Sequence, residues 1–160
     1  MCLGIDQRQR ATPGATENLP ALDAEVIAQL EAAGYTEQQF LLATDTTVVI
    51  PVGQTIVVQV TGSDVIHSWT VPAFGVKTDA VPGRLNEGWF LVEEPGIYYG
   101  QCSELCGVNH AFMPIEVRVV SQAQFDSWAE FMLAGDYEAA YATVDVFAST
   151  EQATQFAAKQ

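Results

Sequence analysis

Two cysteines, a histidine and a methionine lie within the twelve residues 102–113, in the order Cys102, Cys106, His110 and Met113. The chain contains one other histidine, His67, which lies far upstream among strand-like residues. Thiolate, thioether and imidazole ligands together suit copper better than harder metals. The pattern therefore predicts one metal site that uses both histidines of the chain.

Three kinds of metal site are compatible with this ligand set. A structural zinc would use both cysteines and both histidines, but it gains nothing from a thioether. A mononuclear copper needs one thiolate and leaves the second cysteine without a role. A binuclear copper uses every ligand: the thiolates bridge both ions, His67 and His110 each bind one ion, and Met113 and the backbone carbonyl of Glu104 are weak axial ligands. We favour the binuclear copper and keep as alternatives the other metals, a disulfide between the two cysteines and a catalytic Cys–His pair.

The residues around this segment predict a mainly β domain. Runs rich in β-branched residues predict strands at 46–52, 55–60, 65–71, 88–93, 97–100 and 115–120. In the last run, Ile115, Val117 and Val119 alternate with Glu116 and Arg118, which is typical of a strand with one buried face. Pro72, Pro82-Gly83 and Pro95-Gly96 supply turns between the strands. Short strands at this spacing indicate an antiparallel sandwich or barrel.

Helices are expected on both sides of the β region. Apolar residues recur at helical spacing over 22–33, and Gly34 is a natural stop. Ser121 to Gln124 has the form of a capping box, and Phe125, Trp128 and Met132 then form one apolar face. The sequence thus predicts a poorly ordered arm over 1–19, one domain over 20–134 and an acidic, weakly helical tail over 135–160.

The charge of the chain restricts its partners. The net charge is -14, and residues 11–76 contain seven acidic residues and no lysine or arginine. A nucleic-acid partner is therefore not expected. An acidic surface attracts basic proteins, although it also serves simply to keep a protein soluble.

The sequence shows no membrane-spanning or secretion signal. No apolar run reaches the roughly 20 residues that cross a bilayer, and the first residues lack a signal-peptide pattern. We therefore expect the chain as given to be soluble, with Cys2 a free thiol.

The segment from about Leu41 to Trp128 resembles subunit II of the haem-copper cytochrome c oxidases, in its soluble CuA domain. The similar stretches are Asp64-Val65-Ile66-His67-Ser68-Trp69, residues 74–84 from Phe74 to Arg84, Gly100-Gln101-Cys102-Ser103-Glu104-Leu105-Cys106-Gly107, and His110 to Pro114. The resemblance implies a cupredoxin-like Greek-key β-barrel or sandwich. It also implies a binuclear copper centre on the periplasmic side of a bacterial inner membrane, or on the intermembrane-space side in a mitochondrion.

The resemblance implies a function as well. In the family, the copper centre accepts electrons from cytochrome c and passes them to haem in subunit I, where oxygen is reduced and protons are pumped. The chain would then be an enzyme subunit without the oxygen-reducing site. The Glu104 carboxylate would reach a magnesium ion at the boundary with subunit I, and Asp45 and Asp64 would belong to the face that docks cytochrome c.

The chain differs from the family pattern in two respects. Family members begin with two transmembrane helices, which this sequence does not contain, so membrane contact would come only through the oxidase complex or through missing N-terminal helices. They also carry a Trp-Tyr segment upstream of the copper ligands, whereas Trp69, Trp89 and Trp128 all follow His67. The alternative function is a copper-binding or storage module without electron transfer.

Overall fold

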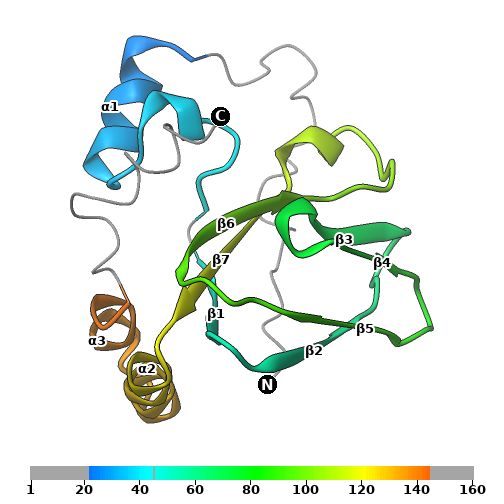
Figure 1. Ribbon diagram of the computed structural model, residues 1–160. Coiled ribbons are helices and arrows are strands. Elements are labelled where there is room, and N and C mark those ends of the chain that lie inside the picture. Colours follow the sequence, from blue (N-terminus) through cyan, green and yellow to red (C-terminus); the bar gives the residue numbers. More distant parts are fainter. Residues whose placement is uncertain (1–21, 45, 145–160) are drawn as a thin grey trace.

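The computed structural model describes residues 22–44 and 46–144 (Figure 1). Its largest sheet has three strands in the order β1 (Val48–Pro51), β7 (Pro114–Val120) and β6 (Gly96–Gln101). β1 runs parallel to β7, and β6 runs antiparallel to it. Two antiparallel ribbons complete the β region: β2 (Thr55–Val60) with β5 (Asn86–Leu91), and β3 (His67–Val71) with β4 (Val76–Ala80).

The main core lies between the three-stranded sheet and the two ribbons. Its buried members are apolar and come from all three sheets: Ile50, Val71, Val76, Phe90, Val92, Ile115, Val117 and Val119. The side chains of Ile115, Val117 and Val119 alternate along β7 as predicted, but Glu116 and Val120 on its other face are buried too, so β7 is covered on both faces rather than on one. Trp69 and Phe74 extend this core by stacking on Phe90, with ring centroids 5.8 and 4.8 Å away. The predicted sandwich is therefore confirmed.

Two features of the β region differ from the prediction. The sheets do not close into a barrel, and the pairing of β1 with β7 is parallel rather than antiparallel. β4 was not predicted as a strand, because Lys77, Asp79 and Ala80 are residue types that strands disfavour. It forms because the turn at 72–75 folds the chain back on β3, where Thr78 pairs with Trp69.

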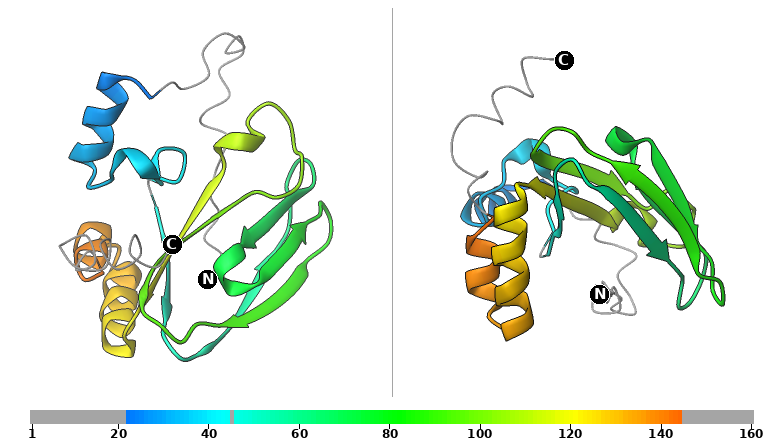
Figure 2. Two further views of the ribbon diagram at one scale, coloured as in Figure 1. Left: turned by 45° about the horizontal axis from the view of Figure 1, so that its top comes forward. Right: turned by 60° about the horizontal axis from the view of Figure 1, so that its bottom comes forward.

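The two C-terminal helices cover one end of the sheet's second face. Helix α2 (Gln122–Ala134) begins at the predicted capping box of Ser121 and Gln124, and helix α3 (Tyr137–Ala142) packs beside it (Figure 2). The buried residues of this second cluster are Val49, Val120, Trp128, Ala140 and Val144. The packed unit thus extends at least to Val144, beyond the expected tail boundary, and residues 145–160 of that tail and the expected arm over 1–19 lie outside the described residues.

The N-terminal segment is attached to the same face by polar groups. Helix α1 (Ala24–Ala32) is capped by Asp23, and the 3₁₀ turn Glu37–Gln39 follows it. The Tyr35 hydroxyl donates to the Glu116 carboxylate at 2.9 Å, and the Gln39 amide donates to the Tyr99 hydroxyl at 2.6 Å. We call Tyr35, Gln39, Tyr99, Glu116 and Arg118 the Glu116 anchor. None of the helices in the described ranges is long and apolar enough to span a membrane.

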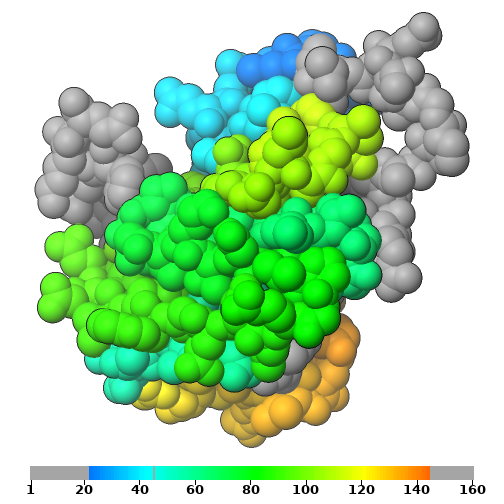
Figure 3. Space-filling view, turned by 90° about the vertical axis from the view of Figure 1, so that its right-hand side faces the viewer, coloured from blue at the N-terminus to red at the C-terminus, as the bar shows by residue number. Residues whose placement is uncertain are grey.

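Segment 22–44 and the helices α2 and α3 lie at opposite ends of the molecule. Segment 22–44, drawn in blue and cyan, lies at the same end as the loop that follows β6, drawn in yellow-green (Figure 3). Helices α2 and α3 lie at the other end (Figures 1 and 3). The segment that holds both cysteines is therefore displayed at one end of the sandwich.

Candidate metal centre

The loop over 102–113 connects two paired strands, so the sheet fixes both of its ends. Gln101 of β6 lies opposite Pro114 of β7, and the Cys102 N–H donates to the Met113 carbonyl at 3.1 Å. The Ser103 N–H donates to the Ser68 carbonyl at 3.2 Å, which ties the loop to β3. Because His67 is the first residue of β3, this tie brings the distant histidine to the loop.

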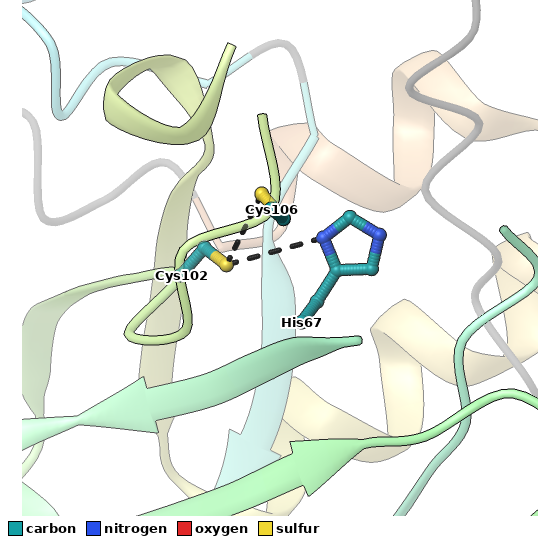
Figure 4. Close-up of side chains that lie close together, drawn as sticks. All are labelled: His67, Cys102 and Cys106. Carbon is teal, nitrogen blue, oxygen red and sulfur yellow. Dashed lines mark hydrogen bonds between the residues drawn. The ribbon is translucent and has the colours of Figure 1, made fainter. Parts of the chain in front are cut away.

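Short contacts link the four strong donor atoms into a bent series, which we call the row, with a histidine nitrogen at its start and its end. His67 Nδ1 lies 4.0 Å from Cys102 Sγ, and the two sulfurs are 3.9 Å apart. His110 Nδ1 lies 3.5 Å from Cys106 Sγ. Figure 4 shows the side chains of His67, Cys102 and Cys106 converging from β3 and the loop. Each of the two adjacent sulfurs thus contacts one histidine nitrogen, so these four side chains could hold metal together.

Each sulfur also contacts one of the predicted weak donors. The Cys102 thiol donates to the Glu104 carbonyl at 3.3 Å, and the Cys106 thiol lies 3.3 Å from Met113 Sδ. The structure therefore brings together all six residues that the sequence pattern singled out. Each thiol has one imidazole and one weak donor beside it, which suits a soft metal at each end of the row.

The spacing of the donors argues against a single zinc ion. His67, Cys102 and Cys106 offer ligand atoms that all lie within 4.8 Å of one another, and His110 does not belong to that group in the described part of the chain. A structural zinc holds all four ligand atoms about 2.0–2.3 Å from one ion, which requires that all four be mutual neighbours. The donors of the row therefore do not form the closed four-ligand cluster of a structural zinc site.

The surroundings of the Cys106 thiol disfavour its charged form. Burial, followed by the hydrogen bond and the charge of Cys102, raises the pKa of Cys106 to about 11. Cys102 itself is buried, with 7% of its surface exposed. Because only the thiolate binds metals, copper uptake at neutral pH must release this proton.

Charged groups lie on both flanks of the loop. Lys77 pairs with Asp79 at 2.8 Å, and this bond is the largest cause that raises the pKa of Lys77; the charges of Glu104 and Cys102 raise it further. The same bond is the largest cause that lowers the pKa of Asp79, and a hydrogen bond from Ser68 lowers this pKa further. The loop carboxylate of Glu104 therefore lies within the field of one lysine.

The two predicted docking acids have different outcomes. Asp45 lies outside the described residues, whereas Asp64 is exposed and its Oδ1 lies 2.8 Å from His67 Nε2. The bond to His67 is the largest cause that lowers the pKa of Asp64, and the Val65 backbone N–H lowers it further. The sequence pattern did not predict this bond; the signal for it is an Asp three residues before a ligand histidine.

Comparison with known proteins agrees with this geometry. Residues 19–120 match the family "Cytochrome C oxidase subunit II, periplasmic domain". Cytochrome c oxidase subunit 2 of Cereibacter sphaeroides is 62% identical over 117 residues, which are 73% of this chain and 39% of that protein. The chain thus spans about two fifths of the length of this curated relative.

Two solved structures are also similar. The periplasmic domain of subunit II of cytochrome oxidase (CoxB) of Bradyrhizobium japonicum has a TM-score of 0.60 and 57% identity, over 61% of this chain and 71% of that one. A mixed disulfide intermediate between thioredoxin-like TlpAs and subunit II of cytochrome c oxidase has a TM-score of 0.50 and 55% identity, over 59% of this chain and 63% of that one. Since the family match covers more than half of the sequence, this chain belongs to the family of periplasmic domains of cytochrome c oxidase subunit II.

Proposed function

We propose that this chain carries the binuclear copper centre of a haem-copper cytochrome c oxidase and transfers electrons from cytochrome c to haem in subunit I. The observation that carries the proposal is the row of donors from His67 through the two sulfurs to His110. Oxygen reduction and proton pumping would then occur in the partner subunit. The copper domain would comprise the expected range 20–134, extended through α3.

The residues of this chain would hold the metal in a frame that is complete before binding. Cys102, Cys106, His67 and His110 would be the strong ligands, and Met113 and the Glu104 carbonyl would be weak ones. When bound, copper supplies a one-electron redox couple. The hydrogen bonds from Cys102 and Ser103 fix the loop to β7 and β3 without any metal, so little rearrangement of the chain is needed during electron transfer.

Copper loading tests this proposal directly. Metal-free, reduced protein titrated with copper should bind two ions per chain and give a paramagnetic resonance pattern from one electron shared equally by two copper nuclei. Voltammetry should show fast, reversible cycling, whereas a storage module would release copper on oxidation. A protein that binds one zinc stoichiometrically and rejects copper would refute the proposal.

Cytochrome c is the proposed electron donor, because the acidic surface of this chain would attract a lysine-rich protein. Segment 22–44 contributes Asp23, Glu25, Glu31 and Glu37 to that surface and contains no lysine or arginine. Asp45 and Asp64 would belong to the docking face. Association with reduced cytochrome c in stopped-flow mixing should weaken as salt rises, because screening shortens to about 8 Å at physiological ionic strength. Association that does not depend on salt would argue against this docking face.

Subunit I is the proposed partner at the rim of the metal loop. Large apolar side chains are exposed there, namely Val65, Ile66, Leu105 and Val108. An apolar rim around a site is typical of a protein interface. The Glu104 carboxylate would contribute to a magnesium ion at this boundary. The chain would then lie on the periplasmic side of the membrane and contact the membrane only through the oxidase complex or through N-terminal helices.

Copper loading would also require both thiols to be reduced. One relative forms a mixed disulfide with a thioredoxin-like protein, and the two sulfurs are only 3.9 Å apart here. We therefore expect a two-electron thiol oxidant, such as a small disulfide, to accept two electrons and two protons from Cys102 and Cys106 and to leave their sulfurs joined in a disulfide, which blocks copper uptake. A dithiol reductant should cleave that bond and restore uptake. The test uses Cys2→Ser protein, so that thiol titration counts the loop cysteines alone. Unchanged copper uptake after oxidation would contradict this requirement.

A further inference from the structure

The two histidines of the metal row differ in what holds their rings. Each directs Nδ1 toward a sulfur, at 4.0 Å for His67 and 3.5 Å for His110. The other ring nitrogen of His67 lies 2.8 Å from the Asp64 carboxylate. For His110, the described part of the chain offers no such partner. His67 is therefore restrained from both sides, and His110 from one.

We propose that Asp64 is a positioning residue of the metal centre: its carboxylate accepts the Nε2–H of His67 and so holds the ring with Nδ1 facing the sulfurs. An ionised carboxylate can only accept hydrogen bonds, so Nε2 carries the proton and the lone pair of Nδ1 is left for a metal. A carboxylate on the outer nitrogen also makes the imidazole a stronger electron donor. This inference rests on the proposed copper site and adds Asp64 as a residue that supports one of its ligands.

The backbone before β3 is built to place Asp64 there. A Cβ on Gly62 would lie 2.5 Å from the Val65 carbonyl oxygen and 2.8 Å from the Ala80 carbonyl oxygen, so only glycine fits at that position. The tight loop that glycine permits brings the chain back against the end of β4, where Ala80 pairs with His67. Asp64 lies within this loop, three residues before the ring that it contacts.

The exposure of Asp64 determines what it can contribute. Its side chain is 68% exposed, against 21% for His67. An exposed salt bridge contributes little to folding stability. Removal of Asp64 should therefore leave the fold intact and still change the metal site, which separates a positioning role from a structural one.

The test compares three variants with the wild-type protein. Asp64→Ala removes the acceptor and the charge, Asp64→Asn keeps an oxygen acceptor without the charge, and Glu93→Ala removes an exposed charge elsewhere. Loss of an outer hydrogen-bond partner lowers metal affinity by about 10-fold or more. We expect Asp64→Ala to show that loss in competition with a copper(I) chelator, Asp64→Asn to be intermediate, and Glu93→Ala to match the wild type.

Two further readouts do not depend on electron-transfer activity. In metal-free protein, the His67 Nε2–H proton should give a protected nitrogen-edited NMR signal, which Asp64→Ala removes and Asp64→Asn retains. In copper-loaded protein, the reduction potential should rise in Asp64→Ala, because weaker donation from His67 destabilises the oxidised state more than the reduced one.

The possible outcomes separate this inference from the proposed function. Equal copper affinity in Asp64→Ala and Glu93→Ala would overturn the positioning role, as would equal losses in the Ala and Asn variants, which would point to charge alone. A protein that binds no copper would refute the proposed function. The NMR signal of metal-free protein would still show whether Asp64 holds the ring, and its absence in the wild type would overturn the inference by itself.

Discussion

The metal loop and the Glu116 anchor lie on the same pair of strands but are built in opposite ways. The loop begins one residue after Gln101, and the anchor includes the pair formed by Tyr99 and Glu116, two positions along the same ladder. In the loop, five of the six candidate ligands come from twelve consecutive residues. In the anchor, Tyr35 and Glu116 are 81 residues apart in sequence.

The two regions also differ in what holds them together. The Glu116 side chain is 1% exposed and accepts from Arg118 Nε at 2.8 Å as well as from Tyr35. A buried, hydrogen-bonded charge of this kind is coupled to the fold, because loss of either partner leaves an uncompensated group. The donors of the loop face one another at distances that a metal would bridge. Substitutions in the loop should therefore affect copper, and substitutions in the anchor should affect folding.

The largest expected effect is on the metal. Cys106→Ser removes one of the two sulfurs in the middle of the row and should abolish the binuclear site. Met113→Leu removes only a weak ligand and should keep both copper ions while shifting the reduction potential. Copper per chain and the paramagnetic resonance spectrum measure both effects.

The matched control for these loop variants is the stability of metal-free protein. The free energy of unfolding of Cys106→Ser, measured with urea in the presence of reductant, should differ from that of the wild type by about 1 kcal/mol or less, because the thiol is only partly buried. If Cys106→Ser and Met113→Leu lost copper equally, the assigned ligand roles would be wrong.

The next largest effect is on folding. Glu116→Ala removes the shared acceptor of Tyr35 and Arg118 from a buried site and should lower the free energy of unfolding by about 3 kcal/mol, the lower end for a broken buried pair. Copper stoichiometry at low temperature should be unchanged. Glu93→Ala, which removes an exposed carboxylate, is the control and should stay within about 0.5 kcal/mol of the wild type.

The contrast between the metal loop and the Glu116 anchor also explains which parts of the molecule were predictable from the sequence. The loop ligands were predictable because their chemistry and their spacing are local. The alternation of Ile115, Val117 and Val119 with Glu116 and Arg118 placed the two polar residues on a separate face, which is correct. It could not show that segment 22–44 covers that face, since the cover depends on hydrogen bonds between distant residues.

The bond between Asp64 and His67 was missed for a related reason. The charge of Asp64 and the family resemblance predicted only that it belongs to a docking face. Its bond depends on the tight loop at Gly62, which only the three-dimensional arrangement with Ala80 reveals. Local chemistry thus predicted the ligands, and long-range packing decided what supports them.

A smaller effect is expected from a single hydrogen bond of the anchor. Tyr35→Phe removes the hydroxyl that contacts the Glu116 carboxylate and the Thr44 carbonyl but keeps the ring. A hydrogen bond to a charged group contributes about 1.5–3 kcal/mol, and the partial exposure of this one favours the lower value. Urea unfolding should therefore show a loss smaller than that of Glu116→Ala. If the double variant were less stable than Glu116→Ala by the full Tyr35→Phe loss, the two residues would not act as one unit.

The smallest effect separates the two regions by pH. Burial, and then the charge of Glu116, raises the pKa of Tyr99 to about 12 from its usual 10.0. The folded state therefore keeps this proton at pH values where the unfolded chain has released it. The contribution of Tyr99 to stability is fully present below pH 10 and falls as pH rises toward 12.

In Tyr99→Phe protein the alkaline loss of stability should be shallower, as measured by urea unfolding at a series of pH values. The phenolate absorbance of the folded protein should also lose a late-titrating component. An alkaline slope identical to that of the wild type would show that Tyr99 does not report on the anchor. Because Tyr99 faces the Glu116 side of the sheet and not the sulfurs, the copper content of the variant below pH 10 should match that of the wild type, which would confine the pH response to the anchor.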